Sequence, residues 1–255
     1  MKYIVYDLDD TLLNDQRKVS EFTLKVLKHL QDSGHKLVIN TARSKYYSQE
    51  FLDAIQPDYA ILNGGALIIN KAGETIFSQT IDVPTVQRII ARLKEVTKVF
   101  SVQSESGFYS SDTNYTAQNA IYFDFWKDTY REPAYKIVTS IADDAKAESI
   151  AKEFDLDMVS YFGGDFKRFT HNKTNKASGN RNLMKLLRAN MADVIAFGDD
   201  WGDLQMLQEA GLGVIMKNAR EELRSLCPII SSYTNNEDGV ARFLLEYFQI
   251  CEPSI

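Results

Sequence analysis

The chain has 255 residues, of which 44% are hydrophobic and 25% charged, with a formal net charge of −6. This balance is typical of a globular protein with a buried core, and it excludes disordered and collagen-like classes. The acidic balance disfavours binding to nucleic acid or to an anionic membrane surface. Because no apolar run approaches the roughly 20 residues of a membrane span and no secretory signal is visible, we expect a cytoplasmic protein. Two cysteines, Cys227 and Cys251, are too few for a disulfide framework or a four-thiolate zinc site.

Short apolar runs alternate with helical patterns in the first part of the chain. The predicted strands are residues 3–6, 37–40 and 59–62, with a helix from Ser20 to about Gly34 and a polar stretch after residue 40. Strands that are nearly all apolar and alternate with helices indicate a parallel sheet covered on both faces.

The C-terminal part has the same pattern. The predicted elements are a helix at 182–188, a strand at 194–197, a helix around 204–207 that ends at Gly211, strands at 213–216 and 228–231 separated by a helix from Ala219, and a final helix around 240–248. We therefore expect both ends of the chain to contribute to one α/β core.

The middle of the chain differs, because its strands look longer and more alternating. Helical patterns lie at 85–96 and 143–154, and aromatic residues crowd 121–126. This composition indicates a separate α+β insertion rather than continued strand–helix units. The prediction is a discontinuous core, residues 1–80 and 167–255, with an inserted domain at 81–166.

Polar side chains follow several predicted core strands directly. Asp7 and Asp9 follow the first strand, Thr41 the second, and Asp199 and Asp203 the strand that ends at residue 197. Ligands of open parallel sheets bind at the carboxyl ends of the strands. Any one of these aspartates alone is more often a helix cap or a turn residue, but the set as a whole indicates a site.

Clustered carboxylates repel one another and need a cation or a proton. All-oxygen ligands suit a hard ion, and Mg2+ is the usual choice where phosphate is handled. Zinc is less suited, since His29, His35 and His171 stand apart in the sequence. Neither a P-loop nor a Gly-x-Gly-x-x-Gly motif is present, which disfavours the nucleotide-binding folds that use them.

Several segments together resemble one family. Asp7-Leu8-Asp9-Asp10-Thr11 resembles the Asp-x-Asp-x-Thr signature of the haloacid dehalogenase (HAD) superfamily, and residues 198–203 resemble its fourth motif. Residues 63–64, 214–219 and 236–241 are similar to its Cof-type, subclass IIB, sugar-phosphatase-like branch. The resemblance implies a Rossmann-like parallel-sheet core with an inserted α/β cap domain, in the place where the insertion lies.

The resemblance also implies a chemistry, Mg2+-dependent hydrolysis of a small phosphorylated metabolite through an aspartyl-phosphate. Asp7 would be the nucleophile, and Asp9 the general acid and base, a role for which its pKa should be raised. Thr41 would bind the phosphoryl group together with backbone amides near Leu8 and Ala42.

Lys176 would complete the catalytic and phosphate-binding set, and we prefer it to Lys173 because the family places this lysine at the start of a helix. The implied metal ligands are Asp7, Asp9 through its carbonyl, Asp199 and Asp203. Arg43 is interpreted as a structural or surface charge.

The chain departs from the family pattern at a few positions. Gly202 stands where the fourth motif usually has Asn, Ala42 where the second motif has Gly, and Ala177 where Gly usually follows the lysine. None of these changes removes a group that the chemistry requires, but turnover and the phosphate subsite can be altered.

Two alternatives remain open. A sugar phosphomutase of the same family would use the same core, and a non-turnover phospho-acceptor or binding protein would use Asp7 alone. Asp9 argues against the acceptor, because a general acid and base serves turnover. Cap residues, including those at 121–126, are expected to influence substrate choice, although that run could simply form the core of the cap.

Overall fold

The structure is a computed structural model that describes residues 1–113, 120–161 and 164–251. The chain divides into two compact units, which we call the core unit (Met1–Phe77 with Asn175–Ile255) and the inserted unit (Ser78–Thr174). The predicted boundary at 167 cuts through the strand β11 (Phe166–His171) and wrongly assigns residues 167–171 to the core unit. This strand pairs with its neighbours in the inserted sheet, so the division falls after it. Within the described residues, no helix is both long and apolar enough to span a membrane.

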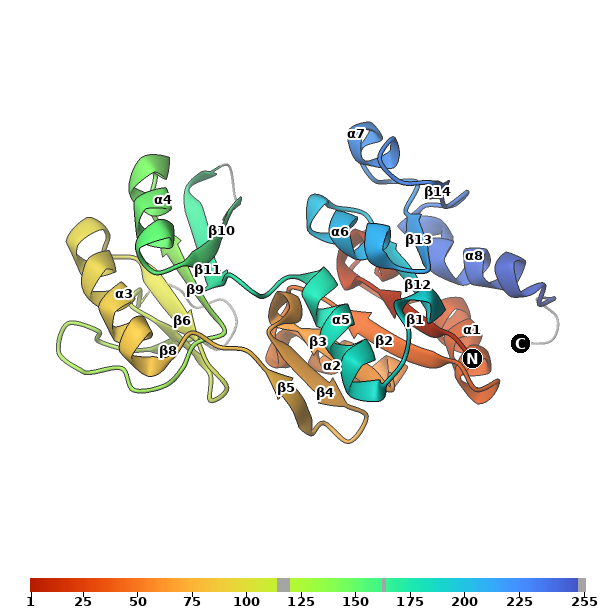
Figure 1. Ribbon diagram of the computed structural model, residues 1–255, viewed down its shortest axis with the longest axis horizontal. Coiled ribbons are helices and arrows are strands. Elements are labelled where there is room, and N and C mark those ends of the chain that lie inside the picture. The colour runs from red at the N-terminus through yellow and green to blue at the C-terminus, as the bar shows by residue number, and fades with distance from the viewer. Residues whose placement is uncertain (114–119, 162–163, 252–255) are drawn as a thin grey trace. The chain divides into compact units, whose positions relative to one another are not determined.

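The core unit alternates strands and helices (Figure 1). Its elements are β1 (Tyr3–Tyr6), α1 (Glu21–Asp32), β2 (Lys36–Asn40), α2 (Lys45–Ile55), β3 (Tyr59–Leu62), β4 (Leu67–Asn70), β5 (Thr75–Ser78), α5 (Lys176–Leu187), β12 (Val194–Gly198), α6 (Trp201–Glu209), β13 (Leu212–Ile215), α7 (Glu221–Arg224), β14 (Ile229–Ile230) and α8 (Gly239–Phe248). The α/β class expected from the sequence is therefore confirmed.

The described strands of the core form one sheet in the order β14-β13-β12-β1-β2-β3-β4-β5. Every pairing from β14 to β3 is parallel, whereas β4 runs antiparallel to β3. The short turn Asn63–Gly65 reverses the chain between them, since a tight turn can join only antiparallel neighbours. The parallel part brings the carboxyl ends of β1, β2 and β12 to one edge.

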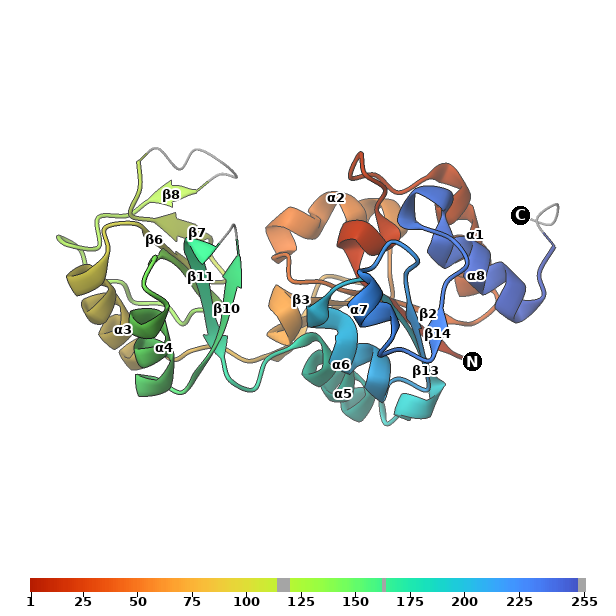
Figure 2. The ribbon, with the colours of Figure 1, turned by 90° about the horizontal axis from the view of Figure 1, so that it is seen from above.

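Helices cover both faces of this sheet (Figure 2). The helices α1, α2 and α8 lie on one face, and α5 and α6 lie on the other. Strand β1 is fully buried along its length, as expected for a strand between two helical layers. The core cluster beneath α5 and α6 includes Val5, Val38 and Ala196 from the central strands.

One helix of the core was not expected from the sequence. The polar stretch after residue 40 contains α2, which begins after Ser44, whose side chain accepts a hydrogen bond from the Tyr47 amide. The helix buries Ser48, Phe51 and Ile55 on one side. Its apolar stripe is too sparse to stand out from the surrounding Lys, Tyr, Ser and Gln residues, and packing in the fold decides the outcome.

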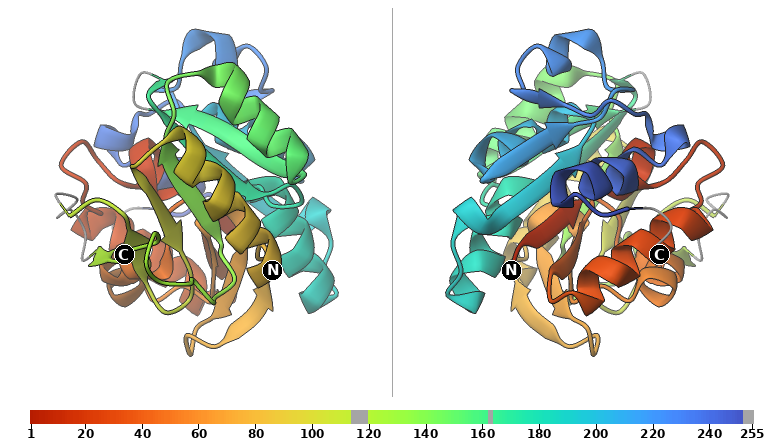
Figure 3. Two further views of the ribbon diagram at one scale, coloured as in Figure 1. Left: turned by 90° about the vertical axis from the view of Figure 1, so that its left-hand side faces the viewer. Right: turned by 90° about the vertical axis from the view of Figure 1, so that its right-hand side faces the viewer.

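The inserted unit is an α+β unit with its own core. Its described elements are α3 (Val83–Val96), β6 (Phe100–Gln103), β7 (Phe108–Ser110), β8 (Ile121–Tyr122), β9 (Lys136–Ser140), α4 (Asp144–Glu153), β10 (Leu156–Tyr161) and β11. The strands form a mostly antiparallel sheet in the order β10-β11-β9-β6-β7-β8, and α3 and α4 lie side by side on one of its faces (Figure 3).

The aromatic run at 121–126 divides between core and surface. Phe125 is 1% exposed and packs against Phe100 and Tyr130, whereas Tyr122 and Trp126 are exposed. The alternative interpretation of the run, as core of the inserted unit, therefore holds for Phe125.

Candidate active site

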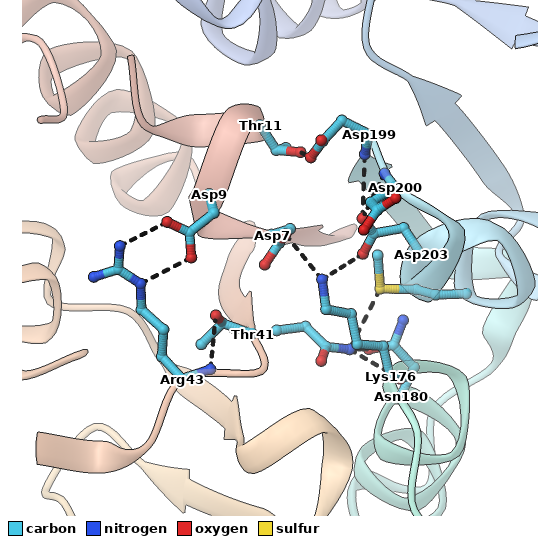
Figure 4. A network of polar contacts seen from close by, with 12 residues as sticks. Asp7, Asp9, Thr11, Thr41, Arg43, Lys176, Asn180, Asp199, Asp200 and Asp203 are labelled. Atoms are coloured by element: carbon cyan, nitrogen blue, oxygen red, sulfur yellow. Dashed lines mark hydrogen bonds and ion pairs between the residues drawn. The ribbon is translucent and has the colours of Figure 1, made fainter. Parts of the chain in front are cut away.

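The site lies at the carboxyl edge of the core sheet (Figure 4). Asp7 follows β1, Thr41 follows β2 and Asp199 follows β12, while Lys176 and Asp203 come from the first turns of α5 and α6. Residues that are far apart in the sequence therefore meet because neighbouring parallel strands end side by side.

A buried cluster of three carboxylates and one ammonium forms the centre of the site. The Lys176 Nζ lies 2.9 Å from Asp7 Oδ2 and 2.6 Å from Asp203 Oδ1. One carboxylate oxygen from each of Asp7, Asp199 and Asp203 lies within 4.8 Å of the others. Asp7, Lys176 and Asp203 are 6%, 8% and 0% exposed. Water therefore screens these charges very little.

Local hydrogen bonds fix Asp199 and Asp203 at the junction between β12 and α6. The amides of Asp199 and Asp200 each donate to Asp203 Oδ2 at 3.2 Å. A Cβ at Gly198 would lie 2.4 Å from the Asp203 Cβ, so this close approach requires glycine. The Thr11 hydroxyl donates to Asp199 Oδ1 at 2.6 Å and links the first loop to this junction.

Lys176 is positioned by the start of α5. Asn175 caps this helix by accepting from the Ser178 amide, and the neighbouring turn approaches so closely that a Cβ at Gly65 would lie 2.2 Å from the Asn175 carbonyl. Gly65 also has a φ of +102°, which a side chain would strain. Asn40, at the end of β2, has a buried side-chain amide that donates to the Lys176 carbonyl and to Asn180 Oδ1, both at 2.9 Å.

Burial and mutual repulsion set the titration of the buried groups. Burial, with the Asp203 charge, raises the pKa of Asp7 to about 7 against the lowering effect of Lys176. Burial likewise raises the pKa of Asp199 to about 8, although the Thr11 hydrogen bond opposes it. Burial alone would lower the pKa of Lys176, but the Asp203 and Asp7 carboxylates outweigh it and raise this pKa. The lysine is therefore charged at neutral pH.

Asp9 lies in a different environment from the one expected. The Arg43 Nε and NH2 groups donate to Asp9 Oδ2 and Oδ1 at 2.8 Å and 2.6 Å, and Arg17 also pairs with Oδ1. Burial alone would raise the pKa of Asp9, but the two guanidinium groups lower it. The expectation of a raised pKa is therefore wrong for this state of the protein. Nothing in the local sequence pattern links Arg43 to Asp9, so the sequence alone indicates only a structural or surface charge there.

The predicted phosphate-binding positions lie around Asp7. Thr41 is 1% exposed and its hydroxyl accepts from the Arg43 amide at 3.2 Å. The Leu8 amide lowers the pKa of Asp7, and Ala42 is half-buried in the loop after β2. These backbone and hydroxyl groups are at the strand ends where a phosphoryl group on Asp7 would need donors.

The remaining sequence positions can also be located. Lys173 is exposed and belongs to the inserted unit, whereas Lys176 contacts Asp7. At Gly202 a Cβ would meet nothing within 4 Å, so the usual asparagine is absent without any steric reason. Ala177 is 1% exposed within α5.

The donor set fits a divalent cation. Asp7 Oδ1 is buried and has no hydrogen-bond partner among the described residues. It belongs to a group of three carboxylates that faces one ammonium, which leaves two excess negative charges when all are ionised. Carboxylate oxygens are the ligands that Mg2+ prefers, and its charge would balance this excess.

Comparisons with known proteins agree with this arrangement. A family model described as "haloacid dehalogenase-like hydrolase" matches residues 4–244. The chain is 27% identical to the 5-amino-6-(5-phospho-D-ribitylamino)uracil phosphatase YitU of Bacillus subtilis, with 97% of each chain covered. It is 25% identical to the phosphatase YwpJ of the same organism, over 96% of this chain and 99% of that protein.

Solved structures share the fold. A haloacid dehalogenase-like hydrolase from Bacteroides thetaiotaomicron matches with a TM-score of 0.84 at 22% identity, covering 97% of this chain and 99% of that one. The subclass IIB sugar phosphatase BT4131 matches with a TM-score of 0.80 at 18% identity, covering 98% and 100%. The resemblance seen in the sequence is thereby confirmed, and the chain belongs to the haloacid dehalogenase-like hydrolases as an enzyme of the phosphatase type.

Proposed function

We propose that the protein hydrolyses a small phosphorylated metabolite with Mg2+ and through an aspartyl-phosphate on Asp7. The observation that carries this proposal is the state of the Asp7 carboxylate. One oxygen is paired with the buried Lys176 ammonium, and the other is buried and has no hydrogen-bond partner among the described residues. A carboxylate held in this way beside other carboxylates is suited to receive a phosphoryl group once cations offset the repulsion.

Lys176 has two tasks in this proposal. Its ammonium orients Asp7 and neutralises part of the charge on the transferring phosphoryl oxygens. Asp203 keeps the ammonium in place through a second ion pair. Thr41 and the amides near Leu8 and Ala42 supply further donors to the phosphoryl group.

Asp7, Asp199 and Asp203 are the side chains that would hold the cation, with Asp9 contributing through its carbonyl as the family resemblance implies. A bound Mg2+ supplies charge neutralisation between the nucleophile and the phosphate. Thr11 keeps Asp199 directed into this cluster by its hydrogen bond.

Two displacement steps complete the reaction. Asp7 attacks phosphorus, the bond to the leaving oxygen breaks, and Asp9 gives that oxygen its proton. Water then gives a proton to Asp9 and attacks phosphorus, the bond to Asp7 breaks, and inorganic phosphate leaves. Asp9 ends the cycle with the proton it began with. Because Arg43 and Arg17 favour its ionised form in this structure, Asp9 must take up that first proton from solvent as the substrate binds.

The proposed substrate class is taken from the names of the relatives. YitU is named for a phosphorylated ribitylamino-uracil and BT4131 is titled a sugar phosphatase, so phosphate monoesters of sugars and sugar alcohols are the first candidates. We propose that the inserted unit acts as the cap and selects among them.

The proposal is tested by a screen of phosphorylated metabolites in which phosphate release is measured with Mg2+ and with excess EDTA. We expect release from at least one sugar or sugar-alcohol phosphate, lost with EDTA and restored by Mg2+. Release that is unaffected by EDTA would contradict the metal assignment. Isomer formation without phosphate release would identify a phosphomutase. A phosphoryl group that stays on Asp7 without turnover would identify a phospho-acceptor.

A further inference from the structure

The turn that carries Thr11 has a strained backbone. Asp10 has a φ of +55°, in the left-handed region that residues other than glycine adopt at a cost. The Leu13 amide donates to the Leu8 carbonyl at 2.8 Å and closes the turn. From this turn the Thr11 hydroxyl donates to Asp199 Oδ1 at 2.6 Å (Figure 4). The direction of the Asp199 carboxylate therefore depends on where the turn places Thr11.

Asn218, which follows β13, binds this turn through its side chain. Its Nδ2 donates to the Asp10 carbonyl at 2.7 Å, and its Oδ1 accepts from the Asn235 backbone amide at 3.0 Å. A side-chain amide has a donor end and an acceptor end, and these two contacts use both. The Asp10 carbonyl belongs to the peptide group that joins Asp10 to Thr11. Asn218 therefore holds the peptide directly before Thr11.

Asn235 holds the same turn on the other side of Thr11. Its side-chain amide donates to the Leu13 carbonyl at 3.0 Å, and Asn235 is 5% exposed. Two asparagines from separate loops thus fix the carbonyls of residues 10 and 13. Asn218 lies in the segment 214–219, which resembles the Cof-type branch and to which the proposed function assigns no task.

The loop of Asn218 is also attached to the segment that carries Asp199. The Met216 amide donates to the Gly198 carbonyl at 2.9 Å, and Gly198 directly precedes Asp199. The hydrogen bonds and the chain together form a closed circuit through Gly198, Met216, Asn218, Asp10, Thr11 and Asp199. The first loop and the junction between β12 and α6 are therefore held at a fixed separation by two routes.

We infer that Asn218 is a positioning residue for the cation site, because it holds Thr11 where its hydroxyl keeps Asp199 turned into the carboxylate cluster. This inference rests on the proposed function, in which Asp199 is one of the residues that hold Mg2+. Groups that orient a metal ligand by a hydrogen bond contribute to metal affinity, and their loss typically weakens it by about 10–100-fold. Asn218 acts on Asp199 through Thr11, so we expect an effect near the lower end of this range.

The direct test is Mg2+ binding to the whole protein without substrate, measured by isothermal titration calorimetry. In Asn218→Ala we expect the Kd for Mg2+ to rise roughly tenfold. The matched control is Asn190→Ala, at an exposed asparagine whose side chain accepts from the Ala192 amide in its own turn, and its Kd should stay unchanged. Urea unfolding measures the stability of both variants separately.

A second variant of the same residue removes only one of the two contacts. Asn218→Asp keeps an acceptor for the Asn235 amide and loses the donor to the Asp10 carbonyl. Its added negative charge by itself favours cation binding. A rise in the Kd for Mg2+, which we expect here too, would therefore come from the lost donor.

A double variant tests whether the effect passes through Thr11. Thr11→Val keeps the shape of the side chain and removes the hydroxyl, so the Kd for Mg2+ should rise at least as much as in Asn218→Ala. In the Thr11→Val background, Asn218→Ala should change the Kd by less than about twofold, because the hydrogen bond that Asn218 supports is already gone. Thr11→Ser keeps the hydroxyl and should bind Mg2+ nearly as the wild type does.

The outcomes separate the inference from the proposed function. An unchanged Kd in Asn218→Ala, with or without a loss of stability, would overturn the positioning role while the phosphatase assignment stands. Losses that add in the double variant would overturn the route through Thr11. A wild-type protein that binds no Mg2+, or whose phosphate release is unaffected by EDTA, would overturn the metal assignment of the proposed function, and this inference with it.

Discussion

Asp7 and Asp9 are two residues apart in one loop and lie in opposite electrostatic environments. Asp7 is 6% exposed and shares one ammonium with another carboxylate, and burial raises its pKa to about 7. Asp9 is more exposed, and two guanidinium groups outweigh its partial burial and lower its pKa. The inner region, which comprises Asp7, Asp199, Asp203 and Lys176, has too little positive charge to balance its carboxylates. The outer region, which comprises Asp9, Arg17 and Arg43, has an excess of positive charge.

This difference bears on the separate tasks proposed for two identical side chains. The inner region would attract a divalent cation, because its carboxylates exceed its one ammonium. The outer region can attract an anionic phosphate ester through its arginines. In this metal-free state the two shifts run opposite to the proposed roles, since a nucleophile must be ionised and an acid must hold a proton. A cation bound at the inner region would lower the pKa of Asp7, and an anionic substrate beside Asp9 would raise the pKa of Asp9.

The largest expected effect comes from the inner region. Asp7→Asn keeps the shape of the side chain but removes the nucleophile, so we expect kcat for 4-nitrophenyl phosphate to fall by at least about 10³-fold. Circular dichroism should show a folded protein. The control is Asp10→Asn, an exposed aspartate in the same loop, which should keep activity near that of the wild type. Activity of Asp7→Asn within a few-fold of wild type would contradict the nucleophile assignment.

The next largest effect tests which lysine supplies the ammonium group beside Asp7. Lys176→Ala should lower kcat by about 10²–10³-fold, since it removes the ammonium that faces Asp7 and Asp203. Lys173→Ala changes an exposed lysine and should alter kcat by less than about threefold, the size of effect usual for a solvated charge. Steady-state kinetics at saturating Mg2+ measures both. The reverse order of the two losses would show that Lys173 is the functional residue.

The inner region was largely predictable from the sequence, and the outer region was not. The apolar run at 3–6 matches β1 residue for residue, so the place of Asp7 at a strand end could be predicted from local pattern alone. Lys176 begins α5, as the family resemblance implied, whereas the helical pattern by itself predicted only residues 182–188. Hydrophobic periodicity therefore located the strand end at Asp7 but not the start of α5.

The contacts that were missed depend on tertiary structure. Arg43 meets Asp9 across 34 positions, and Asn40 meets the Lys176 carbonyl across 136. No periodicity encodes such pairs, because they form only when β1, β2 and α5 come together. A weak signal existed for Asn40, since a polar residue that ends a buried strand needs a hydrogen-bond partner.

Asn40 supports the inner region without touching the nucleophile, and its loss should therefore reduce stability more than binding. In Asn40→Ala the Lys176 carbonyl and Asn180 Oδ1 lose a buried donor. We expect the free energy of unfolding to fall by about 1–3 kcal/mol, with a smaller decrease in kcat. Urea unfolding followed by circular dichroism measures the first effect. Asn172→Ala, at an exposed position, is the control, and an equal loss there would refute the argument from burial.

The smallest effect comes from a carboxylate that resembles Asp9 in its contacts but lies at the other end of the core strands. Asp58 accepts hydrogen bonds from Gln31, Lys36 and the Leu37 amide at 2.9–3.0 Å. Burial alone would raise the pKa of Asp58, but these donors lower it. Because the folded pKa is below the unfolded value of about 3.9, its stabilisation is present above pH 4 and is lost as pH falls through the folded pKa.

Asp58→Asn should therefore lower the free energy of unfolding by about 1 kcal/mol at pH 7 and by less near pH 3, with kcat/KM unchanged. Urea unfolding at the two pH values measures the difference, and Asp32→Asn, in an exposed pair with Lys28, should cost less than about 0.5 kcal/mol. A loss that does not depend on pH would mean that packing, not charge, holds Asp58. A loss of activity would mean that hydrogen-bond donors around a carboxylate far from the site also influence catalysis. The contrast between the surroundings of Asp7 and Asp9 would then no longer explain their proposed roles.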